Sequence, residues 1–422
     1  MIDTLLSVWR SKDLRKKIFF TISILVFIRF VAHIPLPQID RAQLETFLSQ
    51  SENQIFNVLG MFTGGSLSNL SIDLMGVGPY ITASIVVQLL TKVIPAWENI
   101  SKDGSQGREK LNRYTRYLTV PMAIIQGFGT VSLLKSQQVL PFLTTMELAQ
   151  ILITITATSV FVMWLGELIS EKGLGNGISM IIALGIIAGL PQQIANTASV
   201  VESGDYTSLA ILIAIFLGSI ILIVFMNEAE RRIPITYARR ALGAGSKVDS
   251  YLPLKVNSAG VIPIIFALSF LTFPAIIARF LSTNTNERVQ SISQAVTDFV
   301  NNQTYYGILY AVLVVVFAFF YTFIVFQPEQ ISDNLQKQGS FIPGVRPGSE
   351  TTQFIKQTLI RLTTIGSVFL AAIVVVPFMV EQKANLQTLA LGGTSILIIV
   401  SVIIETSRAI NAQLIMRKYD TL

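Results

Sequence analysis

The chain has 422 residues, of which 51% are hydrophobic and 13% are charged, against about 25% charged residues in a typical soluble domain. This composition excludes an ordinary water-soluble protein and predicts a polytopic membrane protein, because many apolar runs reach the roughly 20 residues that a helix needs to cross a bilayer. The formal net charge is +6, and the absence of cysteine excludes disulfides, thiol nucleophiles and thiolate metal sites.

The N-terminal segment 1–17 is basic and leads directly into an apolar run. This order superficially resembles a signal peptide, but no small-residue cleavage site follows and the run continues into "AHIPLP". We therefore expect a retained first span.

Hydropathy predicts ten membrane-spanning helices. Their approximate ranges are 18–37, 76–95, 116–135, 147–168, 178–197, 208–227, 257–281, 305–326, 358–379 and 388–407. An even number places both ends of the chain on the same side of the membrane.

The distribution of lysine and arginine predicts the orientation. If the N-terminus is inside, most basic residues fall in the inner segments, including five between Arg10 and Lys17. The outer segments then hold only a few, namely Arg41, Lys135, Arg279, Arg288 and Lys383. The positive-inside rule therefore predicts that both termini, including a tail at 408–422, are cytoplasmic.

Two cytoplasmic connections, 228–256 and 327–357, are longer than a tight helix–helix turn requires. They mix charged residues with proline and glycine turn signals, which favours docking surfaces. The alternative is that their basic residues only set the topology or contact anionic lipid.

Residues that could support catalysis or metal binding are scarce. The chain has no phosphate-binding loop, no HExxH motif and a single histidine, His33, which we interpret as structural. Charged residues are few inside the predicted spans, and Arg29 and Lys92 can each reach a span end or meet a polar partner near it. We therefore predict no catalytic residue and no metal site, and a ten-span secondary transporter is the alternative function, although it would need charged or ion-coordinating groups at the midplane.

Glycine-rich stretches open four of the spans. They are "GVGPY" at 76–80, "EKGLGNGISM" at 171–180, "NSAGVIP" at 257–263 and "LGGTS" at 391–395. The stretch at 60–80 is also too apolar for a solvated loop, which favours a re-entrant or interfacial segment. Such glycines either permit close helix packing or indicate helices arranged around a central space.

Several motifs resemble the SecY family, the channel subunits of the bacterial Sec protein translocon. They include "RFVAHIPLPQID", "MFTGGSLSNLSI", "GPYITASIVVQLL", "RRIPITYARR", "YLPLKVNSAGVIP" and "NLQKQGSFIPGVRPG", and the resemblance covers about residues 12–410. It implies an all-α polytopic fold with ten transmembrane helices in two inverted-repeat five-helix halves, 18–200 and 201–407. The halves would surround a central hourglass pore with a re-entrant plug helix.

The resemblance also implies the position of the plug and of the pore ring. The plug would be 55–70, with Met61, Phe62, Gly64, Gly65 and Leu67 at its centre. The apolar ring would consist of Val77, Ile81, Ile178, Ile182, Ile265 and Ile398. An apolar constriction of this kind dewets and so excludes ions.

Two further sites are implied by the same resemblance. Thr82, Gln126 and Asn257 match a polar cluster at a lateral gate, although unrelated packing hydrogen bonds are the alternative. Arg239, Arg240 and Arg346 match basic residues that dock the ribosome or the motor ATPase SecA.

As a member of this family, the chain would translocate unfolded polypeptides and release hydrophobic segments laterally into the bacterial cytoplasmic (inner) membrane. The implied partners are SecE, SecG, SecA, the ribosome, signal sequences, unfolded secretory or membrane proteins and membrane lipids. The resemblance implies neither enzymatic activity nor a cofactor, and no direct DNA binding.

Overall fold

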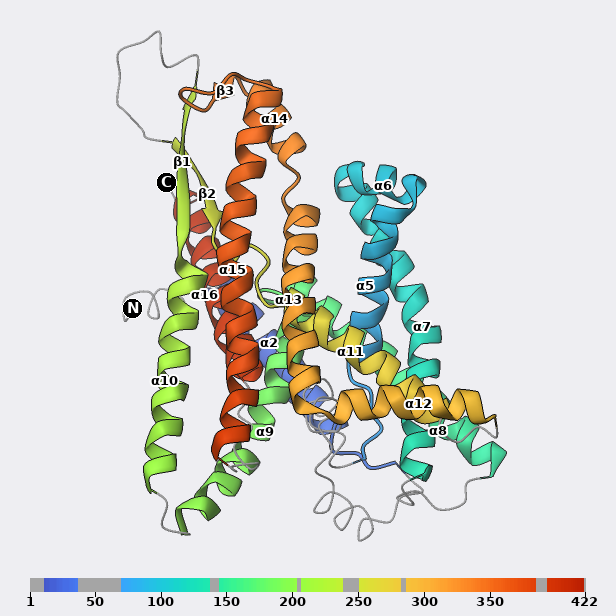
Figure 1. The fold of residues 1–422 in the computed structure, drawn as a ribbon. Coiled ribbons are helices and arrows are strands. Elements are labelled where there is room, and N and C mark those ends of the chain that lie inside the picture. Colours follow the sequence, from blue (N-terminus) through green and yellow to red (C-terminus); the bar gives the residue numbers. More distant parts are fainter. Residues whose placement is uncertain are drawn as a thin grey trace. The chain divides into compact units, whose positions relative to one another are not determined.

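The computed structural model describes residues 11–36, 70–136, 144–202, 206–237, 250–281, 286–384 and 393–420, and these residues are mostly helical (Figure 1). The elements are α2 (Lys12–Val31), α5 (Gly78–Val93), α6 (Pro95–Lys102), α7 (Gly104–Ser136), α8 (Thr145–Lys172), α9 (Gly177–Glu202), α10 (Tyr206–Glu228), β1 (Glu230–Tyr237), β2 (Ser250–Lys255), α11 (Ile262–Leu281), α12 (Glu287–Asn301), α13 (Gln303–Val325), α14 (Pro328–Lys337), β3 (Ser340–Phe341), α15 (Ser349–Ala384) and α16 (Gly393–Asp420).

Each of the ten predicted spans overlaps one of these helices, namely α2, α5, α7, α8, α9, α10, α11, α13, α15 and α16. By length and apolar composition, four described stretches are able to cross a membrane: Thr145–Lys172, Thr304–Lys337, Ser349–Val376 and Thr394–Met416. The pair α5 and α6 would make a fifth, although it bends by 102°. The protein is therefore a multi-pass membrane protein, and ten crossings stay a prediction.

The chain forms two compact units. Unit 1 consists of Met1–Val200, Leu268–Tyr306 and Val402–Leu422, and unit 2 consists of Val201–Ala267 and Gly307–Ser401. One boundary between the units, after Val200, is at the position predicted for the boundary between the two halves. Unit 1 differs from the predicted N-terminal half because it also includes Leu268–Tyr306 and Val402–Leu422. The predicted halves as such stay a prediction.

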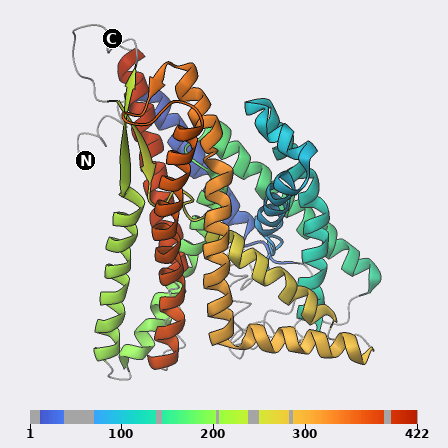
Figure 2. The same cartoon turned by 45° about the horizontal axis from the view of Figure 1, so that its top comes forward.

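In unit 1, α5 and α7 run side by side, as both views show (Figures 1 and 2). The chain turns sharply between α5 and α6 at Ile94, whose backbone is extended, and Pro95 then starts α6. Proline suits the first turn of a helix because its missing N–H would have no partner there. The ring of Trp97 in α6 stacks on Tyr114 in α7, with centroids 5.1 Å apart, which fixes this corner.

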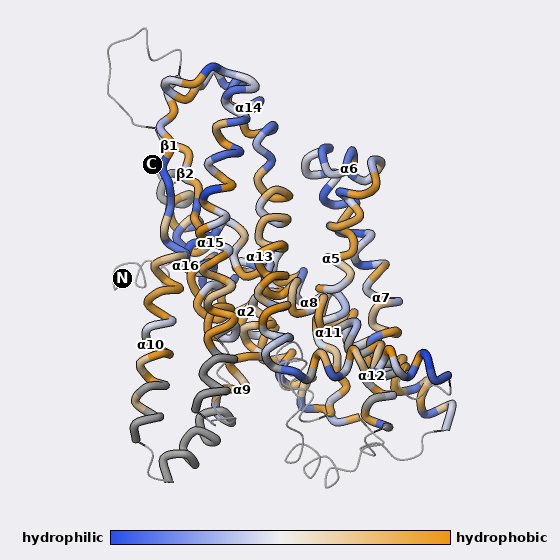
Figure 3. Tube along the Cα trace, in the orientation of Figure 1, coloured by the Kyte–Doolittle hydropathy of each residue, from blue (hydrophilic) through white to orange (hydrophobic). Residues whose placement is uncertain are grey.

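In unit 2, β1 follows α10 almost directly and belongs to an antiparallel sheet with the order β2-β1-β3. Ile233 pairs with Leu252 and Thr236 pairs with Phe341. One side of the sheet, with α14 and α15, covers a core of Ile233, Leu254, Leu335, Ile342, Ile355, Leu359 and Leu362. Figure 3 shows hydrophilic residues on β1 and α14 and hydrophobic ones along α10, α13 and α15.

The sheet corrects the expectation of a purely helical fold. The two connections predicted as loops contain β1 and β2 in one case, and α14, β3 and the start of α15 in the other. The strands escaped prediction because they are short and carry charged residues between their apolar positions. The helices α6 and α12 were also not predicted, since hydropathy detects long apolar runs and both helices are amphipathic.

Candidate functional site

The start of α5 carries the first two residues of the predicted pore ring. Val77 is the N-cap of α5, and Ile81 donates its backbone N–H to the carbonyl oxygen of Val77 at 3.1 Å. Both side chains are buried. Gly76, with φ of 50°, supplies a left-handed turn that a residue with a side chain rarely adopts.

The segment that precedes α5 is tied to the end of α2. The N–H of Leu36 donates to the carbonyl oxygen of Leu70 at 3.0 Å, and the N–H of Ile72 donates to that of Ile34 at 2.9 Å. These two bonds hold the two ends of the segment 37–69 against each other. The predicted plug residues Met61, Phe62, Gly64, Gly65 and Leu67 lie inside this segment and therefore outside the described residues.

Asp73 is a residue of this region that the sequence analysis missed. Its side chain is buried, and its carboxylate interacts electrostatically with the guanidinium of Arg29 in α2. Among the described residues, its Oδ1 atom has no hydrogen-bond partner. The sequence does contain a feature that could have revealed this residue, since Asp73 is the only charged residue between 60 and 80.

Two of the three predicted gate residues contact each other. Gln126 of α7 donates from Nε2 to the hydroxyl of Thr82 in α5 at 2.9 Å, and Thr82 in turn donates to the carbonyl oxygen of Gly78 at 3.1 Å. The third residue, Asn257, belongs to unit 2 and makes a different contact there. The role of all three at a gate stays a prediction.

Asn257 belongs to a buried amide–hydroxyl network within unit 2. Its Nδ2 donates to Oδ1 of Asn227 at 2.7 Å, and Nδ2 of Asn227 donates to the hydroxyl of Ser401 at 2.7 Å. The backbone of α15 also approaches closely here, since a Cβ atom on Gly366 would lie 2.6 Å from the carbonyl oxygen of Val256. The network joins the end of α10 and the third turn of α16 to the turn before α11.

A tight turn between α8 and α9 positions two more predicted ring residues. Gly177, at the start of α9, has no room for a Cβ atom, which would collide with the carbonyl oxygen of Gly166 in α8. The N–H of Gly177 donates to the hydroxyl of Ser170 at 2.8 Å. Ile182 is buried, whereas Ile178 is half-buried and its side chain lies over Gly166.

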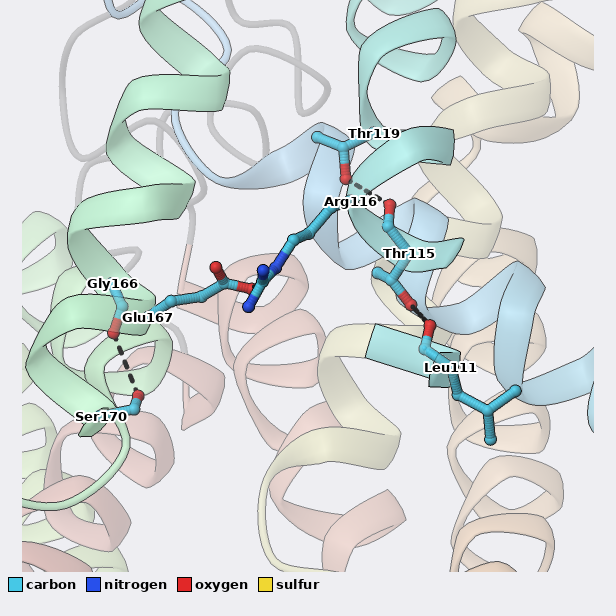
Figure 4. A network of polar contacts seen from close by, with 7 residues as sticks. All are labelled: Leu111, Thr115, Arg116, Thr119, Gly166, Glu167 and Ser170. Atoms are coloured by element: carbon cyan, nitrogen blue, oxygen red, sulfur yellow. Dashed lines mark hydrogen bonds and ion pairs between the residues drawn. The ribbon is translucent and has the colours of Figure 1, made fainter. Parts of the chain in front are cut away.

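The helices α7 and α8 are joined by an ion pair (Figure 4). The guanidinium of Arg116 donates from Nε to Oε1 of Glu167 at 2.8 Å. Figure 4 also shows hydroxyl groups of Thr115, Thr119 and Ser170 donating to carbonyl oxygens one turn earlier in their own helices. Such bonds satisfy a polar side chain inside an apolar bundle.

The remaining predicted ring residues are in unit 2. Ile265 lies in the first turn of α11 and Ile398 lies near the start of α16, and both are buried. All six ring residues thus lie in or next to the first two turns of helices α5, α9, α11 and α16. Their closure into one ring stays a prediction.

Arg346, predicted for docking, is exposed on a turn between β3 and α15. Gly344 with φ of 82° and Gly348 with φ of 101° shape this turn. The hydroxyl of Thr351 donates to the carbonyl oxygen of Arg346 at 2.8 Å, and that of Ser332 in α14 donates to the carbonyl oxygen of Gly348 at 2.9 Å. Arg239 and Arg240 lie outside the described residues.

Comparison with known protein families gives one match. The family model described as SecY matches residues 71–407. Proteins named protein translocase subunit SecY align along the whole chain. The one from Streptomyces galbus is 40% identical over 437 residues, with 100% of this chain and 99% of the relative covered. The one from Synechocystis sp. is 39% identical over 434 residues, with 99% and 96% covered.

Solved structures with a similar fold are channels. A structure titled "The structure of a protein conducting channel" superposes with a TM-score of 0.66 at 19% identity, covering 94% of this chain and 91% of the other. Another, titled "Sec61 in the Canine ribosome-channel complex from the endoplasmic reticulum", has a TM-score of 0.64 at 18% identity with the same coverage. At these identities the likeness concerns the fold.

Proposed function

Because this chain belongs to the SecY family, we propose that it is the central subunit of a protein-conducting channel. It translocates unfolded polypeptides across the cytoplasmic membrane and inserts hydrophobic segments laterally into the lipid. The observation that supports this most strongly is an identity of 40% to a translocase subunit over 100% of this chain. In line with its family, it is a channel subunit and has no enzymatic role.

The pore is closed to ions by the apolar side chains of the predicted ring. Val77, Ile81, Ile182, Ile265 and Ile398 are all buried, which supports a dry constriction. The plug at 55–70 blocks the resting pore. The bonds between 34–36 and 70–72 support this role, since they join the residues that flank the predicted plug segment.

A seam between helices provides the lateral exit. The hydrogen bond between Gln126 and Thr82 is one of the contacts that keep this seam closed, and interhelical bonds of this type contribute about 0.6 kcal/mol each. A hydrophobic signal helix displaces such weak bonds when it enters. Asn257, which is held by Asn227 within unit 2, is the third residue that the family resemblance implies for this gate.

The cytoplasmic face binds the ribosome or SecA. The sheet of β1, β2 and β3 with its apolar core supports a rigid docking surface, as does the turn that carries Arg346. SecE associates with both halves and SecG binds at the periphery. Both termini lie in the cytoplasm of a bacterial cell, as the distribution of basic residues predicts.

A replacement assay tests the function. The chain is expressed in a bacterium from which the resident SecY has been depleted, and export of a secretory precursor and insertion of a multi-span membrane protein are followed by pulse labelling. We expect both processes to recover.

The matched control is the same chain with Ile182 replaced by Asp, which keeps every docking residue. Recovered growth without recovered export would contradict the proposal. So would uptake of a small solute by vesicles that contain the protein but no motor, because this is the behaviour of a transporter.

A further inference from the structure

Helix α12 has three distinct faces. Ser293 and Val300, seven residues apart and therefore on one side of the helix, are 2% and 5% exposed. Ile292 and Phe299, also seven apart and about 100° further round, are 67% and 40% exposed. Gln294 and Asp298 occupy the remaining, exposed side. One side of α12 thus packs against protein, a second presents large apolar groups, and a third presents polar groups.

The chain places α12 at the end of a membrane-crossing stretch. Only Asn302 separates α12 from α13. The stretch Thr304–Lys337, which comprises nearly all of α13 and continues through α14, is able to span a membrane. The C-cap bond from the N–H of Asn302 to the carbonyl oxygen of Asp298, at 3.1 Å, ends α12. The N–H groups of Thr304 and Tyr305 then donate to the side-chain oxygen of Asn302 and start α13. Such a short junction leaves α12 at the depth where α13 begins.

Aromatic residues connect the apolar side of α12 to the surface of α13. The rings of Phe299 and Tyr305 are stacked, with centroids 5.9 Å apart and planes 8° apart. Tyr305 is 57% exposed and begins a stripe of exposed apolar residues along α13, which continues through Ile308, Val312 and Val316. This stripe is the surface that a spanning helix presents to lipid, and tyrosine is enriched where such a surface reaches the headgroups.

The charge on α12 indicates the kind of lipid contact. Its charged residues are Glu287, Arg288 and Asp298, which sum to −1. Attraction to anionic headgroups therefore contributes nothing to binding, and burial of the apolar side chains is what holds the helix.

From these observations we propose that α12 is an interfacial helix, whose residues Ile292 and Phe299 insert into the lipid at the headgroup boundary beside the start of α13. The polar side with Gln294 and Asp298 faces water, and the side with Ser293 and Val300 faces protein. The helix thereby holds the beginning of α13 at a fixed depth. This inference depends on the protein being a membrane protein and not on what passes through it.

The native absence of cysteine makes a direct test possible. The full-length chain, with the companion subunits that co-purify with it, carries a single cysteine in each of four variants, Ile292→Cys, Phe299→Cys, Gln294→Cys and Asp298→Cys. Each variant is labelled with a nitroxide and reconstituted in phosphatidylcholine vesicles. Electron paramagnetic resonance then measures collision of the label with oxygen, which concentrates in lipid, and with a water-soluble nickel chelate.

We expect labels at Ile292 and Phe299 to collide several-fold more with oxygen than with the nickel chelate, and labels at Gln294 and Asp298 to show the opposite ratio. Equal access of the nickel chelate to the apolar side and to the polar side of α12 would overturn the proposal, because the helix would then lie in water. Protection of Ile292 from both reagents would overturn it as well, because a protein partner would then cover this side.

A second measurement avoids dependence on the labelled side chains. Ile292→Trp is made in a background in which Trp9, Trp97 and Trp164 are replaced by Phe, and its fluorescence is followed in vesicles of brominated phosphatidylcholine. We expect strong quenching, unchanged when one third of the lipid is replaced by brominated phosphatidylglycerol. Quenching that requires the anionic lipid would contradict the charge argument, and no quenching would contradict insertion.

Discussion

At the scale of single residues, the described part of the protein combines apolar spans with a few buried polar groups that have specific partners. Asp73 and Arg29 illustrate this at the base of the segment that contains the predicted plug. Arg29 was expected to reach a span end or to meet a polar partner near it, and its electrostatic interaction with Asp73 agrees with the second alternative. A charge in an apolar surrounding is tolerated only with such a partner.

We predict that Arg29→Gln destabilises the protein more than Asp73→Asn does. The first change leaves a buried acidic side chain without its charged neighbour, and its Oδ1 has no hydrogen-bond partner among the described residues, whereas the second leaves a guanidinium on a half-buried side chain. A buried polar group left without a partner costs about 1–3 kcal/mol. Thermal unfolding of the purified variants measures this, with Asp298→Asn on the exposed side of α12 as the control. Strictly additive losses in the double variant would show that the two residues do not interact.

A second residue-scale prediction concerns Gly177. Gly177→Ala would place a Cβ atom against the carbonyl oxygen of Gly166, so α8 and α9 must separate, at a cost of about 1–3 kcal/mol. The matched control is Gly218→Ala in α10, because a Cβ atom there meets nothing within 4 Å. The melting temperature should fall for the first variant and hold or rise for the second. Equal melting temperatures would contradict the close approach.

At the scale of elements, the sequence predicted what hydropathy detects. Each of the ten predicted spans overlaps a helix, because long apolar runs carry a strong signal. Short amphipathic elements carry a weak one, which is why β1, β2, α12 and α14 were missed. At the candidate site, Thr82 and Gln126 contact each other, while their role at a gate with Asn257 stays a prediction. Asp73 was missed because its partner Arg29 is distant in sequence.

The sheet of β1, β2 and β3 gives a prediction about packing. Leu254 is 0% exposed in the core formed with α14 and α15, while Leu252, on the same strand, only packs against the edge of this core. Leu254→Ala should destabilise the sheet by about 2–5 kcal/mol and Leu252→Ala by clearly less. Hydrogen exchange of the β1 and β2 amides, compared between the two variants, measures the difference. Similar exchange in both would argue against this core.

The turn between β3 and α15 gives a prediction about docking. Its backbone is held by Thr351 and Ser332, so the exposed guanidinium of Arg346 is presented at a fixed place. Arg346→Glu should abolish import driven by SecA into inverted vesicles, because the charge at the contact is reversed. Arg346→Lys should be partly tolerated, because it keeps the charge and loses the bidentate geometry.

The control for this turn is Lys337→Glu at the end of α14, which is exposed and makes an equal change of charge. It should import normally if the fixed position of Arg346 matters. Near-normal import with Arg346→Glu would refute the docking role.

At the scale of the whole molecule, the proposed channel must stay closed to ions while it admits a polypeptide. The predicted ring residues all lie at or near helix starts, and glycine-containing turns precede α5 and α9. Glycine permits these turns to place the first residues of each helix close to neighbouring backbone, as Gly177 shows against Gly166. In the proposed channel, a narrow apolar opening built from such helix starts can widen by small movements of the helices.

The ring itself is tested by ion conductance. Ile182→Asp replaces a buried apolar group of the predicted ring with a charge, so water should enter the proposed constriction and ions should cross with it. We expect purified protein with this change to raise the conductance of a planar bilayer at rest, while Ile182→Leu, which conserves volume and polarity, keeps it at the wild-type level. A second variant, Ile398→Asp in α16, should act in the same direction if the two residues line one pore. If neither aspartate variant raised the resting conductance, although both unfolded at the wild-type temperature, the constriction would have to lie elsewhere.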